Sequence, residues 1–146
     1  MQVQPYLFFE GRTEEALDFY TEAIGAQVTA KMRFGEAPPM DPNDKGCADM
    51  GGMPPNSANK IMHSEFKIGN TSVLASDGMC SGKTNFTGVS LALQVKNDAE
   101  AKKVFEALAK GGQIQQPLMA TFFATSFGMV ADKFGVGWMV VTEGTP

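Results

Sequence analysis

The sequence predicts an α+β fold of two βαβββ units that form a curved mixed sheet, with a helix on the outer face of each unit. Two observations predict it. The 146 residues contain the order strand, helix and three strands twice, and each half holds one amphipathic helix. The sheet face opposite the helices would be concave and uncovered. Such a face must bind a molecule, pack against a partner or stay hydrated.

The first unit is predicted over residues 1–80. Its helix lies in the stretch RTEEALDFYTEAIGA, where acidic residues in the first turn suit the helix dipole and Gly25 suits the C-terminal cap. Residues 35–60 are rich in proline and methionine and have no apolar period, so we expect a long loop there. The apolar stripe of the helix contains Ala16, Leu17, Tyr20 and Ile24. Strands are expected at residues 3–10, 26–34, 62–68 and 71–76.

The second unit is predicted over residues 86–143. Its helix lies in NDAEAKKVFEALAKGG, which Asn97 or Asp98 caps and the glycine pair at residues 111–112 ends. The stripe of this helix contains Ala101, Val104, Phe105 and Leu108. Strands are expected at residues 88–95, around 113–115, and at 123–131 and 137–142.

Composition narrows the classes of function. A net charge of -4 and scattered basic residues argue against a nucleic-acid partner, which needs clustered Lys and Arg. No apolar run approaches the length of a membrane span, and residues 1–9 do not resemble a secretory signal. Cys47 and Cys80 lack the spacing of a metal or redox motif. We therefore expect one domain over residues 1–146, located in the reducing cytoplasm, with no membrane partner.

His63, the single histidine, is the first candidate for chemistry. Strict alternation along its strand would place it on one face with Ile61, Glu65 and Lys67. Three interpretations stay open. His63 is a partly solvated strand residue near Glu65, a polar group that lines the concave face, or a metal ligand in a site completed by carboxylates such as Glu65 and Asp77.

Three stretches carry a resemblance to a known family: PYLFFEGRTEEALDFY, KIMHSEFKIG with VLASD, and PLMATFFATSFGMVADKFGVGWMV. The chain resembles the PhnB-like branch of the vicinal oxygen chelate superfamily, which includes glyoxalase I, bleomycin-resistance proteins and extradiol dioxygenases. The third stretch is the most specific, because it is similar to the branch signature with D-x-F-G-x-x-W-M. The resemblance implies the glyoxalase/bleomycin-resistance/dioxygenase fold, in which the two units share one domain.

The resemblance also implies where a divalent metal would be held. The four ligand positions of the superfamily fall near Gln4, within residues 74–76, at Ser90 and at Val141. Of the side chains at these positions only Gln4 offers a reasonable ligand, because Leu, Ala and Val cannot coordinate and a serine hydroxyl is a poor partner. We therefore predict no cofactor, while a divalent metal stays an alternative. Some members of the branch carry the name demethylubiquinone methyltransferase, but the glycine-rich nucleotide loop of a common S-adenosylmethionine fold is absent from the sequence.

The favoured hypothesis is a protein that binds a small apolar or aromatic molecule in its cavity without the usual metal site. Whether it is an enzyme stays undecided. One alternative is a metal-dependent lyase, isomerase or dioxygenase, and another is an assembly module without catalysis. A homodimer is expected under all three. Strand parity and the resemblance suggest that the cavity is lined by Gln4, Tyr6, Phe8, His63, Ser90, Ala92, Gln94, Phe123 and Met139.

Overall fold

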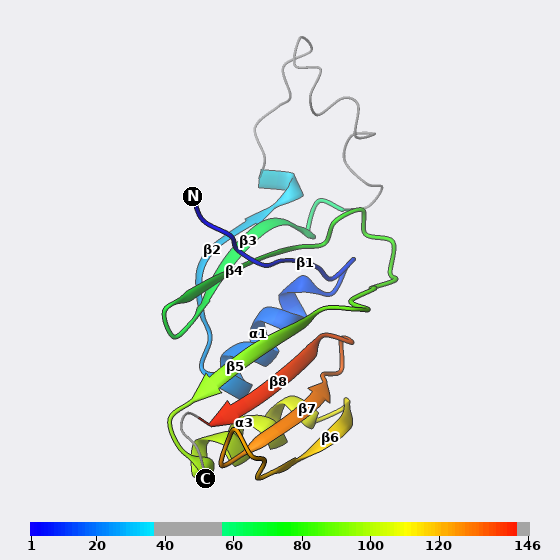
Figure 1. Ribbon diagram of the computed structural model, residues 1–146. Coiled ribbons are helices and arrows are strands. Elements are labelled where there is room, and N and C mark those ends of the chain that lie inside the picture. The colour runs from blue at the N-terminus through cyan, green and yellow to red at the C-terminus, as the bar shows by residue number, and fades with distance from the viewer. Residues whose placement is uncertain (37–56, 143–146) are drawn as a thin grey trace. The chain divides into compact units, whose positions relative to one another are not determined.

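The computed structural model describes residues 1–36 and 57–142 (Figure 1). The chain divides into two compact units, Met1–Lys83 and Thr84–Pro146. Most of the loop predicted at residues 35–60 lies outside the described residues, and so does Cys47.

The first unit is a four-stranded mixed sheet with one long helix on one of its faces (Figure 1). The strand order is β1-β4-β3-β2, with β1 parallel to β4 and the other pairs antiparallel. A short 3-10 helix follows β2 at Phe34–Glu36. The other elements are β1 (Tyr6–Phe8), α1 (Thr13–Ile24), β2 (Gln27–Arg33), β3 (Ile61–Ile68) and β4 (Thr71–Ser76).

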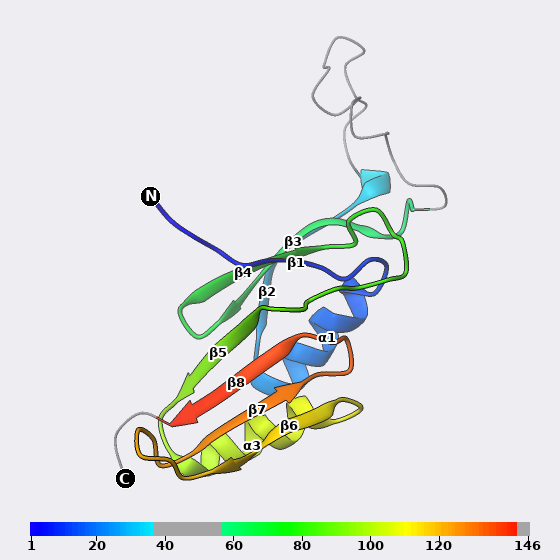
Figure 2. The ribbon, with the colours of Figure 1, turned by 45° about the vertical axis from the view of Figure 1, so that its right-hand side comes forward.

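The second unit repeats this topology in the order β5-β8-β7-β6, with β5 parallel to β8. Its helix α3 covers one face of the sheet and contacts all four strands (Figures 1 and 2). The repeated element order and the α+β class predicted from the sequence are therefore confirmed. The elements are β5 (Ser90–Val95), α3 (Asp98–Ala109), β6 (Gln113–Met119), β7 (Phe127–Ala131) and β8 (Gly137–Thr142).

The helix-facing side of each sheet forms the core of its unit. In β1 the alternation places Leu7 on the buried side, while the flanking Tyr6 and Phe8 are exposed. In the first core the rings of Tyr20 and Phe66 stack at 5.8 Å between centroids. The predicted stripe of α3 is confirmed, since all four of its residues are buried. In α1, Ala16, Leu17 and Tyr20 are buried, whereas Ile24 is only half-buried.

The end of α1 and the start of α3 are as their sequences predict, whereas α3 ends at Ala109, before the predicted glycine pair. Gly25 follows α1 in the left-handed conformation, with φ of 70°, and its backbone N–H donates to the carbonyl of Tyr20. Asn97, rather than Asp98, caps α3, because its side-chain oxygen accepts a hydrogen bond from the Glu100 backbone N–H at 2.8 Å.

A buried carboxylate holds the start of α1. Asp77, which directly follows β4, accepts hydrogen bonds from the backbone N–H groups of Gly11 and Thr13 at 2.9 and 2.8 Å through one oxygen. Its other oxygen accepts from the Ile61 N–H at 2.7 Å. One side chain therefore joins the helix, β3 and the end of β4.

A second buried carboxylate organises the turn between β7 and β8. Asp132 accepts from the backbone N–H groups of Phe134 and Val136 at 2.9 and 3.1 Å, and from the Trp138 indole N–H at 2.9 Å. These residues belong to the D-x-F-G-x-x-W-M signature. The most specific motif in the sequence is thus a structural turn that positions β8.

Two details of the strands differ from the sequence prediction: the facing of residues in β3 and the start of β7. A register shift between Met32 and Arg33, opposite the start of β3, interrupts the alternation, so that Ile61 is fully buried whereas His63 is half-buried. The expected shared face of Ile61 and His63 is therefore wrong. The strand expected over residues 123–131 begins only at Phe127, because the Thr121 hydroxyl accepts from the Ala124 N–H at 3.2 Å and forms a local turn.

Candidate functional site

The uncovered face of the first unit carries a compact group of rings. The Tyr6 hydroxyl lies 3.1 Å from Nδ1 of His63, and the two rings lie 5.7 Å apart. The ring of Phe8 lies 4.9 Å from that of Tyr6. Tyr6 is 38% and Phe8 49% exposed, so these rings are accessible on the side away from α1. Such a group can stack against a flat molecule and offer one polar contact.

The surroundings of these rings are partly polar. Glu65 and Tyr6 both pair with Leu74, on opposite sides of β4, and the exposed Met32 pairs with His63. The first face therefore combines aromatic rings with an imidazole and a carboxylate. Of the predicted cavity residues, Gln4 lies just before β1 and is half-buried, so it adjoins this face without belonging to the strand.

The uncovered face of the second unit is organised as three rows that cross β5, β8 and β7. Residues paired across neighbouring strands share one side of a sheet, so the strand registers define these rows. The first row holds small residues, of which one is a serine, the second holds two methionines, and the third contains an aromatic ring. The rows are Ser90, Gly137 and Ala131; Ala92, Met139 and Met129; and Gln94, Val141 and Phe127.

Aromatic side chains gather beyond the third row. The ring of Phe127 lies 5.2 Å from that of Phe123, which in turn lies 5.1 Å from that of Phe122. Phe123 was predicted on a strand but lies in the turn before β7, where it is 44% exposed. Its ring nevertheless reaches the end of the uncovered face through Phe127.

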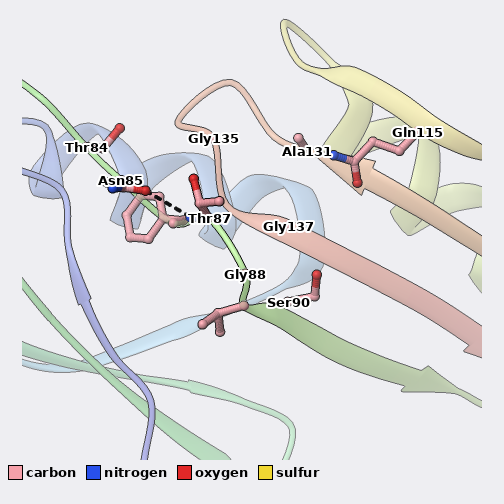
Figure 3. Close-up of a pocket in the computed structure, with 11 residues that line it drawn as sticks. Thr84, Asn85, Thr87, Gly88, Ser90, Gln115, Ala131, Gly135 and Gly137 are labelled. Atoms are coloured by element: carbon pink, nitrogen blue, oxygen red, sulfur yellow. Dashed lines mark hydrogen bonds between the residues drawn. The ribbon is translucent and has the colours of Figure 1, made fainter.

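A pocket of about 470 Å³ lies at the other end of this face, next to the first row (Figure 3). Its floor contains Ser90, Ala131 and Gly137, and the segment of residues 84–89 lines it together with Gln115 and Gly135. Its volume falls within the range of sites for small molecules. Among the predicted cavity residues of the second unit, Ser90 alone lines this pocket.

Apart from Gln4, the residues at the metal positions of the superfamily offer no good metal ligand. Leu74 and Val141 lie in β4 and β8 with hydrocarbon side chains, and Ser90 in β5 offers only a hydroxyl. Asp77, one of the alternative ligands, already binds three backbone N–H groups. Within residues 1–36 and 57–142 no three His, Cys, Asp or Glu side chains are grouped for a metal ion.

Ionisable groups outside the two faces have structural roles. Burial raises the pKa of the Cys80 thiol, which keeps it protonated and poorly nucleophilic at neutral pH. The Thr125 and Ser126 hydroxyls each lie 2.7 Å from Oδ1 of Asp98 and hold the pKa of that carboxyl below its ordinary value. Arg33, and more weakly Lys31, lower the pKa of Glu14. These three groups serve local structure rather than a shared site.

Residues 1–141 match the model of a family described as 3-demethylubiquinone-9 3-methyltransferase. The chain belongs to this family. It is also 36% identical to protein YjdN of Escherichia coli strain K12 over 140 residues, which cover 96% of this chain and 94% of that protein.

Solved structures agree with the fold. Protein PA1353 of Pseudomonas aeruginosa is 38% identical, with a TM-score of 0.78 and 98% of each chain covered. A putative 3-demethylubiquinone-9 3-methyltransferase, PhnB protein, of Bacillus cereus is 26% identical, with a TM-score of 0.73 over 97% of this chain and 99% of that one. A glyoxalase/bleomycin resistance protein/dioxygenase superfamily member of Sphaerobacter thermophilus, 14% identical and 98% covered on both sides, has a TM-score of 0.56 and shows the fold alone. The PhnB-like resemblance inferred from the sequence is confirmed.

Sequence reasoning missed several residues of the second face. Phe127 and Met129 follow from the alternation of β7 once that strand is placed correctly, because they pair with Val141 and Met139. The pocket wall at residues 84–89 has no sequence signal, since it depends on how an irregular segment packs beside β5. Neither of the two long helices described by the structure is long and apolar enough to cross a membrane.

Proposed function

We propose that this protein binds a small apolar or aromatic molecule on the uncovered faces of its sheets and does not use the metal positions of its superfamily. The observation that carries the proposal is the accessibility of large apolar side chains on these faces. Phe8 and Phe123 are 49% and 44% exposed, with Tyr6 and Phe127 in ring contact beside them. Exposed apolar side chains that are grouped together often mark a site for a ligand or a protein partner.

The family description names a methyltransferase, but the contacts of the helix starts do not favour a nucleotide-like cofactor. The N–H of Thr13 at the start of α1 donates to Asp77, and the N–H of Glu100 in α3 donates to Asn97. These helix N-termini already hold acceptors from the chain itself, so they are poorly suited to bind an anionic group such as the carboxylate of S-adenosylmethionine. We therefore favour binding over methyl transfer.

Two further parts of the proposal concern the state of the protein. We expect a homodimer, since open sheets with exposed apolar side chains gain burial by pairing. We expect a cytoplasmic location because the half-buried Cys80 is a free thiol in the structure, and free cysteines are usual in reducing compartments. Sedimentation analysis of the purified protein tests the first, and localisation of a tagged chain tests the second.

The decisive experiment combines native mass spectrometry with ligand titration. The purified protein is weighed before and after addition of Ni²⁺, Zn²⁺, Fe²⁺ and Mn²⁺, and is then titrated with 1-naphthol, a flat aromatic alcohol. We expect no stoichiometric metal and saturable binding of 1-naphthol. A stoichiometric metal that a chelator removes would contradict the proposal and would make His63 the first ligand to test.

Substitutions assign the binding to a face. Tyr6→Ala is expected to weaken 1-naphthol about fivefold if the first face binds it, because an aromatic contact contributes about 1 kcal/mol. Met139→Ala tests the second face in the same way. His63→Ala is expected to keep the affinity within about tenfold, or 1.4 kcal/mol. If neither Tyr6→Ala nor Met139→Ala changes the affinity, the molecule binds elsewhere.

A further inference from the structure

The pocket beside the first row of the second face exists because that row is built from small residues. Ser90 pairs with Gly137 in the parallel β5–β8 ladder, and Gly137 pairs with Ala131 of β7. In the next row these strands carry Ala92, Met139 and Met129, so the floor rises where the methionines begin. The hollow therefore results from the change from small to large side chains between neighbouring rows of the same face.

The chemistry of the pocket is polar and neutral. Its side chains offer hydroxyl and amide groups, and none of its lining residues is acidic, basic or a histidine (Figure 3). The hydroxyls of Thr87 and Ser90 and the amide of Gln115 line the pocket. These groups can bind a neutral donor or acceptor, whereas an ionised group would lose hydration without meeting an opposite charge.

The wall of the pocket is held in place by contacts within the second unit. The Thr84 hydroxyl donates to the backbone carbonyl of Phe134 at 3.1 Å, and the Thr87 N–H donates to the side-chain oxygen of Asn85 at 3.1 Å. Gly137 keeps the floor open, because a Cβ there would lie 2.8 Å from the Ser90 hydroxyl oxygen and would force that hydroxyl to shift. The pocket is thus formed before any ligand binds, which lowers the entropy cost of binding.

We propose that this pocket is the subsite for a neutral hydrogen-bonding group, such as an alcohol, amide or carbonyl, at one end of the bound molecule. The apolar body of the same molecule lies along the methionine row toward Phe127. This inference rests on the proposed binding role. It adds the orientation of the bound molecule and the preference for an uncharged head group. The ligand class is a short amphiphile with an apolar body and an uncharged head.

Three probes of one shape test the selectivity: 4-phenylbutan-1-ol, 4-phenylbutanoate and butylbenzene. Affinities are measured by calorimetry, and the methyl signals of Met129 and Met139 report contact with the body in NMR spectra. We expect the alcohol to bind about tenfold tighter than butylbenzene, which equals about 1.4 kcal/mol and is within the range of one or two net hydrogen bonds. The carboxylate is expected to bind at least about tenfold more weakly than the alcohol.

Two variants and a control locate the head group. Ser90→Ala and Gln115→Ala are each expected to reduce the advantage of the alcohol to about threefold or less while leaving butylbenzene within about twofold. Gln113→Ala removes the same amide two residues away, at a position that does not line the pocket, and is expected to leave all affinities unchanged.

The outcomes separate the two proposals. Failure of both butylbenzene and the alcohol to bind would contradict the binding role itself. Binding of butylbenzene with no preference for the alcohol, or a carboxylate that binds as tightly as the alcohol, would overturn the subsite alone. Equal losses for the alcohol and butylbenzene in Ser90→Ala would also overturn it, because the serine would then act on the apolar body.

Discussion

The two units of this chain share one topology and differ in what their uncovered faces carry. In the first unit that face holds Tyr6 and Phe8 beside an imidazole and a carboxylate. In the second it grades from a small polar pocket through two methionines to aromatic rings. Both buried faces, by contrast, pack apolar side chains against a helix. The comparison teaches that packing against the helix constrains one face of each sheet to apolar side chains, while the other face can carry different chemistry in each unit.

Each unit also contains one buried aspartate that accepts three hydrogen bonds. Asp77 joins the start of α1 to β3, and Asp132 holds the turn before β8. The roles are comparable although the positions differ: one follows β4 and the other follows β7. Substitutions of corresponding residues in the two units test how far this comparison holds.

The largest effects are expected from Asp77→Ala and Asp132→Ala. Each leaves three N–H donors without their acceptor, and a buried unsatisfied donor costs about 1–3 kcal/mol, so the free energy of unfolding should fall by about 3 kcal/mol or more in each variant. Urea denaturation measures this. Asp18→Ala, at an exposed position of α1, is the matched control and should change stability by less than about 0.5 kcal/mol. If Asp132→Ala left the free energy of unfolding nearly unchanged, the two carboxylates would not have equivalent roles.

The segments after the two helices should respond unequally to glycine substitution. A Cβ at Gly112 would lie 2.1 Å from the carbonyl oxygen of Ala131, whereas a Cβ at Gly25 meets nothing within 4 Å. Gly112→Ala is expected to destabilise the protein by about 3 kcal/mol. Gly25→Ala should cost only about 1 kcal/mol, from the positive φ. Thermal and urea unfolding measure both, and equal losses would show that the close approach after α3 relaxes freely.

Acid should weaken the second unit through Asp98. The hydroxyls of Thr125 and Ser126 lower the pKa of this carboxyl, so its stabilising contribution is complete above the ordinary Asp pKa of about 4 and is lost as the pH falls through the lower folded value. The stability difference between the wild type and Asp98→Asn should therefore shrink in acid. Urea denaturation from neutral to acidic pH measures this, with Asp18→Asn as the control. A difference that stays constant with pH would contradict the assignment.

The smallest of the expected effects is a change in the stability of the first unit with salt concentration. Glu14 pairs with Arg33 and with Lys31, the latter at 3.4 Å, and all three side chains are partly exposed. Exposed ion pairs contribute about 0–1 kcal/mol and are screened at about 1 M salt. Glu14→Gln should therefore cost less stability in high salt than in low salt, whereas the cost of Asp98→Asn should depend less on salt, because its hydroxyl partners are uncharged and only its interaction with the helix dipole is screened. Equal salt dependence would remove this distinction between the units.

The sequence alone determined the repeated element order, the helix stripes and the alternation of β1 and β5, because these depend on local period and on capping residues. It also identified the family. Tertiary structure decided what local pattern cannot encode. The bulge opposite Ile61 depends on pairing with β2, and the turn at Thr121 removed Phe123 from its strand. The signature aspartate became a structural acceptor because Trp138 and the turn N–H groups converge on it. The pocket arises only where Ser90, Gly137 and Ala131 lie side by side, and residues far apart in sequence become neighbours through strand register alone.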